Sequence, residues 1–481
     1  MSPEYQVGDR IVGGNFAHVV NEVEVALLNA GAKIIVLSDR IVVVDSHIAQ
    51  RCAEGVGRAE VAFGAMAGAT DQQITSFFEV FELRLAQDRH FEPVLAANSI
   101  DLENARSRGR AVGRLEITPK MRSDMIESAR MWAQSAVRKE VAVEQVQHRG
   151  WSVEKVASPL GVVAFVFEGR PNVCVDATGV LRTGNTCVFR IGSDALGTAQ
   201  AIMKHCLTPA LVEAGLPQDA VVLLDEAERS AGFALFSDRR ISLAVARGSG
   251  EAVRDLGYVA QSNGIATSLH GTGGAWMILG DSVDANWFAE TLVNSIDRKV
   301  CNTLNVCCVP RSRERELMSV LAKQLRSVSA QRGKPIVVHT VGENPDAVRE
   351  LLCPEIEVLP ARVDELSTEW EWDAAPEFFV VATDSIEESF ALCNRYSPQF
   401  VVSVLSGDPL EHQRAWNTLN APFVGNGFTR WVDGQYALGK PELGLSNWEQ
   451  GRALGRGGIL SGDDIRTFRF RMVQKDSDVH R

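Results

Sequence analysis

The sequence predicts an α/β protein whose parallel β-sheets are covered by helices on both faces. Two series of short apolar segments, within residues 161–280 and 300–425, alternate with segments of helical pattern. Strands that alternate with helices form parallel sheets, because each helix returns the chain to the edge where the previous strand began. An apolar fraction of 45% and a charged fraction of 23% are ordinary for a globular protein, so extensive disorder is excluded.

The expected strands are short, apolar and bounded by polar residues. The first series predicts strands at 161–167, 186–191, 220–225, 241–246 and 275–280, and the second predicts strands at 305–310, 335–340, 377–383 and 400–406. Residues 51–150 have a mainly helical and charged pattern, and Thr70 or Asp71 is expected to cap a helix over 72–87. The division into two series rests on the sheet pattern, because no long linker separates them.

Residues 1–50 precede this pattern. Two short strands are expected at 34–37 and 41–44, and Gly31 suits the end of a helix whose apolar residues are Val19, Val20, Val23, Leu27 and Leu28. Two interpretations stay open: an N-terminal addition that packs on the body of the protein, or a surface for a partner or for oligomerisation.

Charge and cysteine content exclude several classes of protein. The chain has 49 basic and 61 acidic residues, which gives a net charge of -12. A nucleic-acid-binding protein usually carries an excess of basic residues, and a net negative charge also opposes binding to an anionic membrane. The sequence has no apolar run of membrane-spanning length and no apolar signal core at its start. Its nine cysteines are odd in number and scattered, which predicts reduced thiols in a cytoplasmic protein.

Several common motifs are missing from the sequence, and Cys301 is the strongest remaining candidate for chemistry. No HExxH or Cys-x-x-Cys motif supports a metal site, and the P-loop, GxSxG and GxGxxG motifs are absent. Cys301 follows Arg298 and Lys299 directly before an expected strand, and nearby positive charge lowers a thiol pKa. Cys301 is therefore a candidate nucleophile, the alternative being a buried apolar thiol like Cys307 and Cys308.

Two further polar segments follow expected strands, where open α/β sheets bind ligands. Arg170 and Asn172 follow strand 161–167, and an asparagine amide at this place can donate to an oxyanion. Arg247, Gly248 and Gly250 follow strand 241–246 and open a helix, where backbone amides can approach a phosphate. Each segment also fits an ordinary turn.

Taken together, these segments resemble the γ-glutamyl phosphate reductase (glutamate-5-semialdehyde dehydrogenase) branch of the aldehyde dehydrogenase superfamily. The resemblance runs from about residue 51 to 475. It is carried by SPLGVVAFVFEGRPNVCVDATGVLRTGNTCVFRIGSDA (158–195), ANSIDLENARSRG (97–109), ARGSG (246–250), VCNTLNV (300–306) and NGFTRWVDGQYALG (426–439). It implies a Rossmann-type cofactor domain over 51–290, a catalytic domain over 291–425, and a C-terminal substrate loop and oligomerisation segment over 426–481, with a strand near 466–473.

The resemblance also implies the chemistry and the residues that perform it. Cys301 would attack an acyl phosphate to form a thioester, which NADPH, or alternatively NADH, reduces to the aldehyde, while Asn172 holds the oxyanion. The implied cofactor-binding residues are Arg190, Gly192, Ser193, Arg247, Gly248 and Gly250, and the implied substrate-binding residues are Arg170, Asn426, Phe428 and Arg430. Glu369, Glu371 and Glu377 each fit the position that contacts the cofactor ribose.

The sequence departs from the family at several places. Hydrolytic members carry a glutamate where this chain reads LHGTGG (269–274), so poor thioester hydrolysis is expected. The family's Cys-His is replaced by Ala275 and Trp276, and Phe428 stands where the family has a small polar residue. These changes favour a related acyl substrate that is bulkier or bound among aromatic residues.

Two other functions stay open. The chain could reduce a CoA-bound or carrier-bound acyl thioester, or it could be a non-catalytic homologue that binds a partner. The partners expected for the reductase are a small activated acid, further copies of the chain in a homo-oligomer and, as a further option, an upstream kinase. No metal, nucleic acid or membrane is expected.

Overall fold

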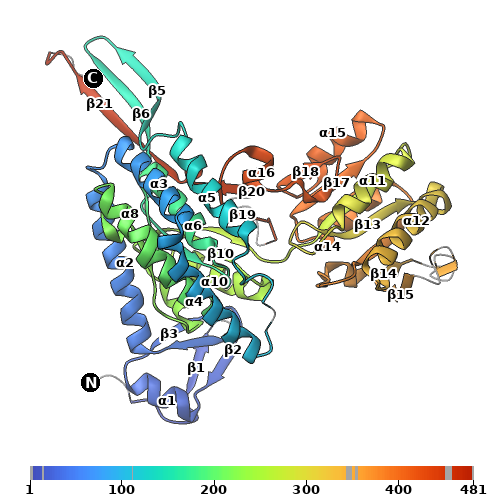
Figure 1. Cartoon of the computed structure of the whole chain (residues 1–481), viewed down its shortest axis with the longest axis horizontal. Helices are drawn as coiled ribbons and strands as arrows, with labels where there is room; N and C mark the ends of the chain where they lie inside the picture. The colour runs from blue at the N-terminus through green and yellow to red at the C-terminus, as the bar shows by residue number, and fades with distance from the viewer. Residues whose placement is uncertain are drawn as a thin grey trace. The chain divides into compact units, whose positions relative to one another are not determined.

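The chain divides into two units, each with its own parallel sheet (Figure 1). This computed structural model describes residues 4–13, 16–110, 112–342, 349–350, 352, 356–449 and 458–478. The first unit comprises Met1–Leu269, Leu438–Leu445 and Ile459–Arg481, and the second comprises His270–Ala437 and Ser446–Gly458. The family resemblance implies a domain boundary at 290, whereas the structure divides the chain between Leu269 and His270.

The sheet of the first unit has the strand order β11-β10-β7-β8-β9. Its strands are β7 (Val162–Val166), β8 (Thr186–Arg190), β9 (Val221–Leu223), β10 (Ile241–Arg247) and β11 (Ala266–His270). The pairs β10–β7, β7–β8 and β8–β9 are parallel, which confirms the predicted topology. Because these strands are parallel, the segments that follow β7, β8 and β10 lie at the same edge of the sheet.

Helices cover both faces of this sheet. They are α2 (Ser46–Met66), α3 (Asp71–Ala86), α4 (Asp88–Ser107), α5 (Pro119–Gln134), α6 (Val173–Thr178), α7 (Leu196–Ile202), α8 (Thr208–Glu213), α9 (Ser230–Phe236) and α10 (Gly250–Ser262). One apolar cluster joins Phe165 and Phe189 to α3–α5, and the cluster on the opposite face joins Val188 to α2, α9 and α10. As predicted, Thr70 caps α3, in a capping box with Gln73.

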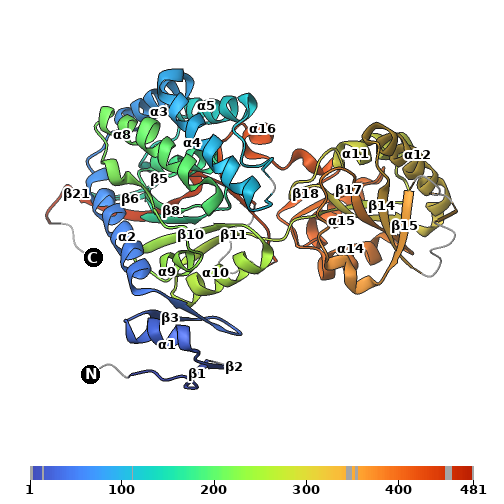
Figure 2. The same cartoon turned by 60° about the horizontal axis from the view of Figure 1, so that its bottom comes forward.

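The N-terminal segment contains β1 (Arg10–Gly13), β2 (Phe16–Val19), α1 (Glu22–Asn29), β3 (Lys33–Val36) and β4 (Ile41–Val44). β3 and β4 form an antiparallel hairpin at the predicted positions (Figure 2). Its Ile35, Leu37 and Val44 are buried in the same apolar cluster as residues of α9 and α10. Arg40 forms an ion pair with Asp255 of α10. The expectation that this segment packs on the body of the protein is therefore confirmed for the hairpin.

A three-stranded antiparallel sheet projects from the first unit (Figure 1). Its strands are β5 (Val141–His148), β6 (Trp151–Pro159) and β21 (Arg466–Gln474), in the order β21-β6-β5. β21 matches the strand expected near 466–473. β5 corrects the expectation of a mainly helical pattern over 51–150. We call these three strands the arm.

The second unit is built on a seven-stranded sheet of order β15-β14-β16-β13-β12-β17-β18. The strands are β12 (Ala275–Leu279), β13 (Leu304–Pro310), β14 (Ile336–Val341), β15 (Ile356–Ala361), β16 (Glu377–Thr383), β17 (Val401–Leu405) and β18 (Phe423–Gly425). All six neighbouring pairs are parallel. β12 lies between β13 and β17, which explains why the division falls before residue 290.

Helices α11 (Ala285–Ser295), α12 (Glu314–Arg332), α14 (Ile386–Tyr396) and α15 (Pro409–Thr418) accompany this sheet, and two apolar clusters fill its faces. The chain continues through α16 (Gly434–Leu438), β19 (Glu442–Ser446) and β20 (Gly458–Ser461). Among the described residues, no helix is long and apolar enough to cross a membrane, and no group of three or more His, Cys, Asp or Glu side chains has the arrangement of a metal site.

Candidate active site

Cys301 lies in a turn directly before β13 and is partly exposed, whereas the seven other cysteines in the described ranges are buried. Burial raises the pKa of Cys307 to about 12 and raises the pKa of Cys308 well above its ordinary value. Buried, protonated thiols are poor nucleophiles. Cys301 is therefore the thiol in the described part of the chain that is best placed to react.

Hydrogen bonds within the second unit fix the backbone of the Cys301 turn. Thr303 Oγ1 accepts from the Val300 N–H (2.9 Å) and donates to the Arg298 carbonyl (2.7 Å). The Gly274 N–H donates to the Cys301 carbonyl (2.7 Å). Gly274 has φ +99°, in the left-handed region that favours glycine, so this residue type is required at the turn that holds the nucleophile.

A buried ion pair lies beside the same turn. Lys299 Nζ is 2.6 Å from Glu369 Oε1, and the Lys299 side chain is only 6% exposed. Glu369 Oε2 accepts from the Gly273 N–H at 2.6 Å. A Cβ placed on Gly273 would lie 2.5 Å from Glu369 Oε1 and 2.8 Å from the Cys301 Cα, so the carboxylate and the nucleophile backbone flank this glycine.

This carboxylate differs from the glutamate of a hydrolytic site. Both oxygens of Glu369 are engaged, one by the Lys299 ammonium and one by the Gly273 N–H. Because protein donors already engage both oxygens, this carboxylate is not arranged to activate a water for hydrolysis of a thioester. The geometry therefore agrees with the expectation of poor thioester hydrolysis, although Glu369 stands next to the nucleophile turn.

The three glutamates considered for the cofactor ribose have different surroundings. Glu369 lies at the Cys301 turn, and Glu371 is 3.7 Å from Lys299 and largely exposed. Glu377 instead pairs with His339 on the neighbouring strand at 2.8 Å. Which of the three glutamates contacts the cofactor ribose stays a prediction. Glu369 and Glu371 lie near Lys299, whereas Glu377 is paired with His339.

Arg430 joins two residues that flank Cys301. Its Nε is 2.7 Å from Asp297 Oδ1, and its Nη1 donates to Asn302 Oδ1 at 2.6 Å. Asn302 is buried and donates in turn to the Val432 carbonyl at 2.9 Å. These contacts connect the 429–432 segment to the residue after the nucleophile. Substrate binding by Arg430 stays a prediction, but the guanidinium is already engaged at two of its nitrogens.

Replacing Arg430 by lysine distinguishes a role in positioning the Cys301 turn from a role in binding the substrate. Lysine keeps the charge but cannot reach Asp297 and Asn302 with a planar fork. If Arg430 positions the nucleophile turn, kcat and the melting temperature both fall while KM for the acyl substrate changes little. A rise in KM with unchanged kcat and melting temperature would show instead that Arg430 grips the substrate. Steady-state kinetics and thermal unfolding of the variant decide between them.

The other expected substrate residues of this unit lie at its surface. Asn426 lines a cavity of about 250 Å³ with His412, Trp416 and neighbouring residues, and the Phe428 side chain is 38% exposed.

Trp276 is fully buried on β12 and packs in the core cluster that contains Phe379. The substitution at Trp276 therefore alters the packing of the sheet rather than an exposed binding surface.

In the first unit, Asn172 follows β7 and directly precedes α6. Its side chain caps no helix N–H and forms no hydrogen bond with the residues that the structure describes. Arg170 lies beside Glu168, with its Nε 2.7 Å from Glu168 Oε1. Asn172 thus combines a position at the ligand-binding edge of the sheet with an uncommitted amide, as an oxyanion donor requires.

The sequence analysis did not identify Asp176, which lies in α6 about one helical turn after Asn172. Asp176 Oδ2 is 3.2 Å from Arg247 Nη1, and both side chains are mostly buried. Burial raises the pKa of the Asp176 carboxyl to about 7; Arg247 opposes this shift and Glu442 adds to it. The spacing of Asp176 from Asn172 was the signal that could have found it.

This raised pKa predicts a pH-dependent contribution to stability. Between pH 4 and about 7 the unfolded state has ionised this carboxyl while the folded state still holds the proton. The free energy of unfolding of the wild type, relative to Asp176→Asn, should fall by up to about 1.4 kcal/mol per pH unit over this range. Chemical denaturation of both proteins between pH 5 and 8 measures the difference. A difference that is flat or rises from pH 5 to 7 would contradict the assignment.

The expected cofactor residues lie at one edge of the first sheet, but they are not equally accessible. Arg190 is buried and its Nη2 donates to the Ala227 carbonyl at 2.6 Å. A Cβ on Gly192 would come within 2.8 Å of the Gly169 backbone nitrogen, so Gly192 allows two ligand-side loops to approach each other. Ser193 follows in a short 3₁₀ turn over Ser193–Ala195.

The start of α10 fits a dinucleotide phosphate. The helix begins at Gly250, and Ser249 precedes it without capping it through its side chain. Gly248 is bordered by open space, since a Cβ on this residue would meet only Val253 Cγ2, at 3.9 Å. Gly248, Ser249 and Gly250 would hold the phosphate groups through their backbone N–H groups. Arg247 itself is engaged with Asp176.

Comparison with known proteins agrees with this fold. Residues 105–340 match the model of the aldehyde dehydrogenase family. The chain is 25% identical to a γ-glutamyl phosphate reductase of Kosmotoga olearia, over 84% of this chain and 93% of that protein, and 27% identical to one of Koribacter versatilis, over 75% and 84%. The crystal structure of γ-glutamyl phosphate reductase from Thermotoga maritima has a TM-score of 0.77 at 23% identity and covers 90% of this chain and 100% of that one.

The similarity to the aldehyde dehydrogenase family lies in residues 105–340, and together with the relatives above it supports an oxidoreductase that uses a nicotinamide cofactor and a small-molecule substrate. Within that family, the curated relatives named above are γ-glutamyl phosphate reductases. An acetylating aldehyde dehydrogenase from Geobacillus thermoglucosidasius shares the fold, with a TM-score of 0.61 at 14% identity.

Proposed function

We propose that this protein reduces γ-glutamyl phosphate, or a closely related acyl phosphate, to the aldehyde through a thioester on Cys301. The observation that carries the proposal is the Cys301 turn, which presents one partly exposed thiol beside a carboxylate, Glu369, that Lys299 and the Gly273 N–H engage. The relatives named γ-glutamyl phosphate reductase match over most of the chain and support this substrate.

The proposed reaction balances in two steps. The Cys301 thiolate attacks the acyl carbon, a carbon–sulfur bond forms, and inorganic phosphate leaves with the electrons of the broken carbon–oxygen bond. A nicotinamide cofactor, held at Gly248, Ser249 and Gly250, would supply the hydride that the thioester carbonyl carbon needs. Asn172 is proposed to donate to the carbonyl oxygen as charge develops on it. Cleavage of the carbon–sulfur bond then releases the aldehyde and returns the Cys301 thiolate.

A coupled assay tests the proposal. A kinase makes γ-glutamyl phosphate in situ, and cofactor oxidation and phosphate release are followed with NADPH and, separately, with NADH. The proposal predicts phosphate release equal to cofactor oxidation, with NADPH the preferred reductant. Turnover with a CoA thioester and none with the acyl phosphate would favour the acyl-thioester reductase instead. No turnover with either donor, together with an unreactive Cys301, would favour a non-catalytic homologue. The kinase stays a predicted partner.

We further propose that the arm joins copies of the chain into a homo-oligomer. Phe468, Phe470 and Met472 alternate along β21 and therefore point to the same side, and all three are more than half exposed. On β5, Val141 and Val143 are also exposed. Such a row of apolar side chains on an edge strand is typical of an interface.

Phe470→Asp is expected to reduce the oligomer to a smaller species, because a carboxylate would be buried without a partner in the interface. Light scattering coupled to size-exclusion chromatography measures the mass. Leu410→Asp, at a side chain of similar exposure on α15, is the matched control and should leave the mass unchanged. An unchanged mass for Phe470→Asp would show that the arm does not join the subunits.

A further inference from the structure

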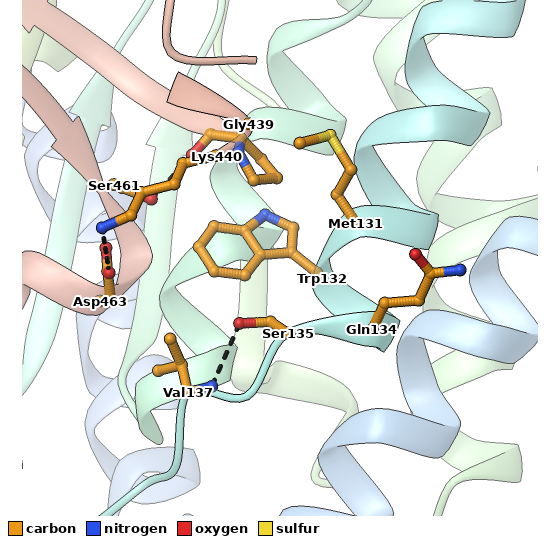
Figure 3. Close-up of a pocket in the computed structure, with 10 residues that line it drawn as sticks. Met131, Trp132, Gln134, Ser135, Val137, Gly439, Lys440, Ser461 and Asp463 are labelled. Atoms are coloured by element: carbon orange, nitrogen blue, oxygen red, sulfur yellow. Dashed lines mark hydrogen bonds and ion pairs between the residues drawn. The ribbon is translucent and has the colours of Figure 1, made fainter. Parts of the chain in front are cut away.

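A second cavity, of about 340 Å³, lies in the first unit at the C-terminal end of α5 (Figure 3). Its walls come from α5 and the residues after it, from the segment 439–441, and from Ser461 and Asp463. The lining residues are Met131, Trp132, Gln134, Ser135, Val137, Gly439, Lys440, Pro441, Ser461 and Asp463. This volume suits a small metabolite. None of these residues takes part in the chemistry proposed for Cys301 and Asn172.

Trp132 presents an unsatisfied donor at this cavity. The residue is 2% exposed, and its indole Nε1 is buried without a hydrogen-bond acceptor. The ring packs closely against Gly179 and Gly462, since a Cβ on either glycine would lie 2.8–3.0 Å from ring atoms of Trp132. The indole therefore cannot turn to find another acceptor. Figure 3 shows its nitrogen directed to the side of the cavity where Gly439 and Lys440 lie.

Asp463 and Lys440 contribute opposite charges to the same wall. Lys440 Nζ is 2.7 Å from Asp463 Oδ2, and the Lys440 side chain is half exposed, so the cavity communicates with solvent there. Asp463 Oδ1 is buried and accepts no hydrogen bond. The residues that line the cavity therefore include one unpaired donor, Trp132 Nε1, and one unpaired acceptor, Asp463 Oδ1. Because buried polar groups are normally paired, these two atoms call for an explanation.

We infer that this cavity binds a small α-amino acid as its zwitterion. The ligand carboxylate accepts from Trp132 Nε1 and Lys440 Nζ, and its ammonium donates to Asp463 Oδ1. A simple anion would meet the Asp463 carboxylate, and a simple cation would meet the Lys440 ammonium, whereas a zwitterion satisfies both. Met131 and Pro441 offer apolar contact for a small aliphatic side chain.

The cavity is separate from the proposed acyl site. Trp132 packs on Gly179, which ends α6, whereas Asn172 precedes the first residue of that helix. The six residues of α6 span about 9 Å, more than a glutamyl group would bridge while its acyl carbon is held at Asn172. The amino acid is therefore an additional ligand and not the acyl substrate.

Isothermal titration calorimetry on the whole protein, without cofactor or acyl phosphate, tests this inference independently of turnover. The probes are L-proline, L-valine and L-leucine. At least one is expected to bind, and its analogue without the amine, or with the carboxylate converted to an amide, should bind at least 10-fold more weakly. For L-proline these analogues are cyclopentanecarboxylate and L-prolinamide. Absence of binding by all three amino acids at 10 mM would overturn the inference.

Two variants locate the site. Trp132→Phe removes the N–H but keeps the ring, and Asp463→Asn removes the charge; each should weaken binding about 10-fold. Trp370→Phe is the matched control, because Trp370 also has a buried indole nitrogen without a partner but lies in the second unit. Thermal unfolding shows whether each variant is folded. Binding that is unchanged in folded Trp132→Phe and Asp463→Asn, or lost equally in Trp370→Phe, would overturn the assignment to this cavity.

Discussion

Cys301→Ala is expected to abolish reduction of the acyl substrate completely while the protein stays folded and still binds its nicotinamide cofactor. Without the thiol no thioester forms, and the hydride has no acyl-enzyme to reduce, so no partial rate remains. The turn itself is held through the Cys301 carbonyl and Thr303, which the substitution does not remove. Cofactor oxidation with the acyl phosphate, together with cofactor binding by fluorescence, measures both outcomes.

Cys307→Ala and Cys308→Ala are the controls for this prediction. Both thiols are buried on β13 with raised pKa values, so neither is a nucleophile, and both variants should keep activity if they fold. Substantial turnover by Cys301→Ala would contradict the thioester mechanism. Equal losses in all three variants would indicate damage to β13 instead.

Asn172→Ala is expected to lower kcat by roughly 10²–10³, the usual loss when one oxyanion donor is removed, with a smaller change in substrate binding. The side chain forms no hydrogen bond with the described residues, so its removal should cost little stability. Steady-state kinetics with saturating cofactor measures the effect.

Asn185→Ala serves as the structural comparison for Asn172. Asn185 is fully buried, and its Oδ1 accepts from the Leu160 and Gly161 N–H groups at 2.7 and 2.9 Å. Its loss should lower the melting temperature, in contrast to Asn172→Ala. If Asn172→Ala binds cofactor poorly and reacts normally once saturated, the oxyanion role is wrong.

The buried strands were the most predictable part of the fold. β7, β8, β10 and β13 are short apolar runs bounded by polar turns, and their positions agree with the expected ranges to within a residue or two. The sheet to which a strand belongs was not predictable from these runs. β12 is the last strand of the first predicted series, but its neighbours β13 and β17 come later in the chain. Periodicity carries no information on such pairing.

β5 shows why an exposed strand was missed. Its residues, VAVEQVQH, show no regular alternation of apolar and polar side chains and all eight are exposed, so there is no buried face to mark the strand. Its existence depends on pairing with β6, which in turn pairs with β21 more than 300 residues later. A local pattern cannot anticipate a partner so distant in the sequence.

The candidate site was predictable only where one short motif contains it. Cys301 and Asn172 each stand in a local motif after or before an expected strand. The pair of Lys299 and Glu369 joins residues 70 positions apart, and Asp176 with Arg247 joins residues 71 apart. These pairs form only when the chain folds, because each carboxylate has its cationic partner on a segment that is distant in the sequence.

The most direct test of the account is to trap the acyl-enzyme. The protein is mixed with γ-glutamyl phosphate made in situ, without nicotinamide cofactor, and analysed by intact-protein and peptide mass spectrometry. The account predicts one γ-glutamyl group as a thioester on the peptide that contains Cys301, its disappearance when NADPH is added, and no adduct in Cys301→Ala. An adduct on another residue, or full reduction of the acyl phosphate in the absence of any adduct, would contradict it.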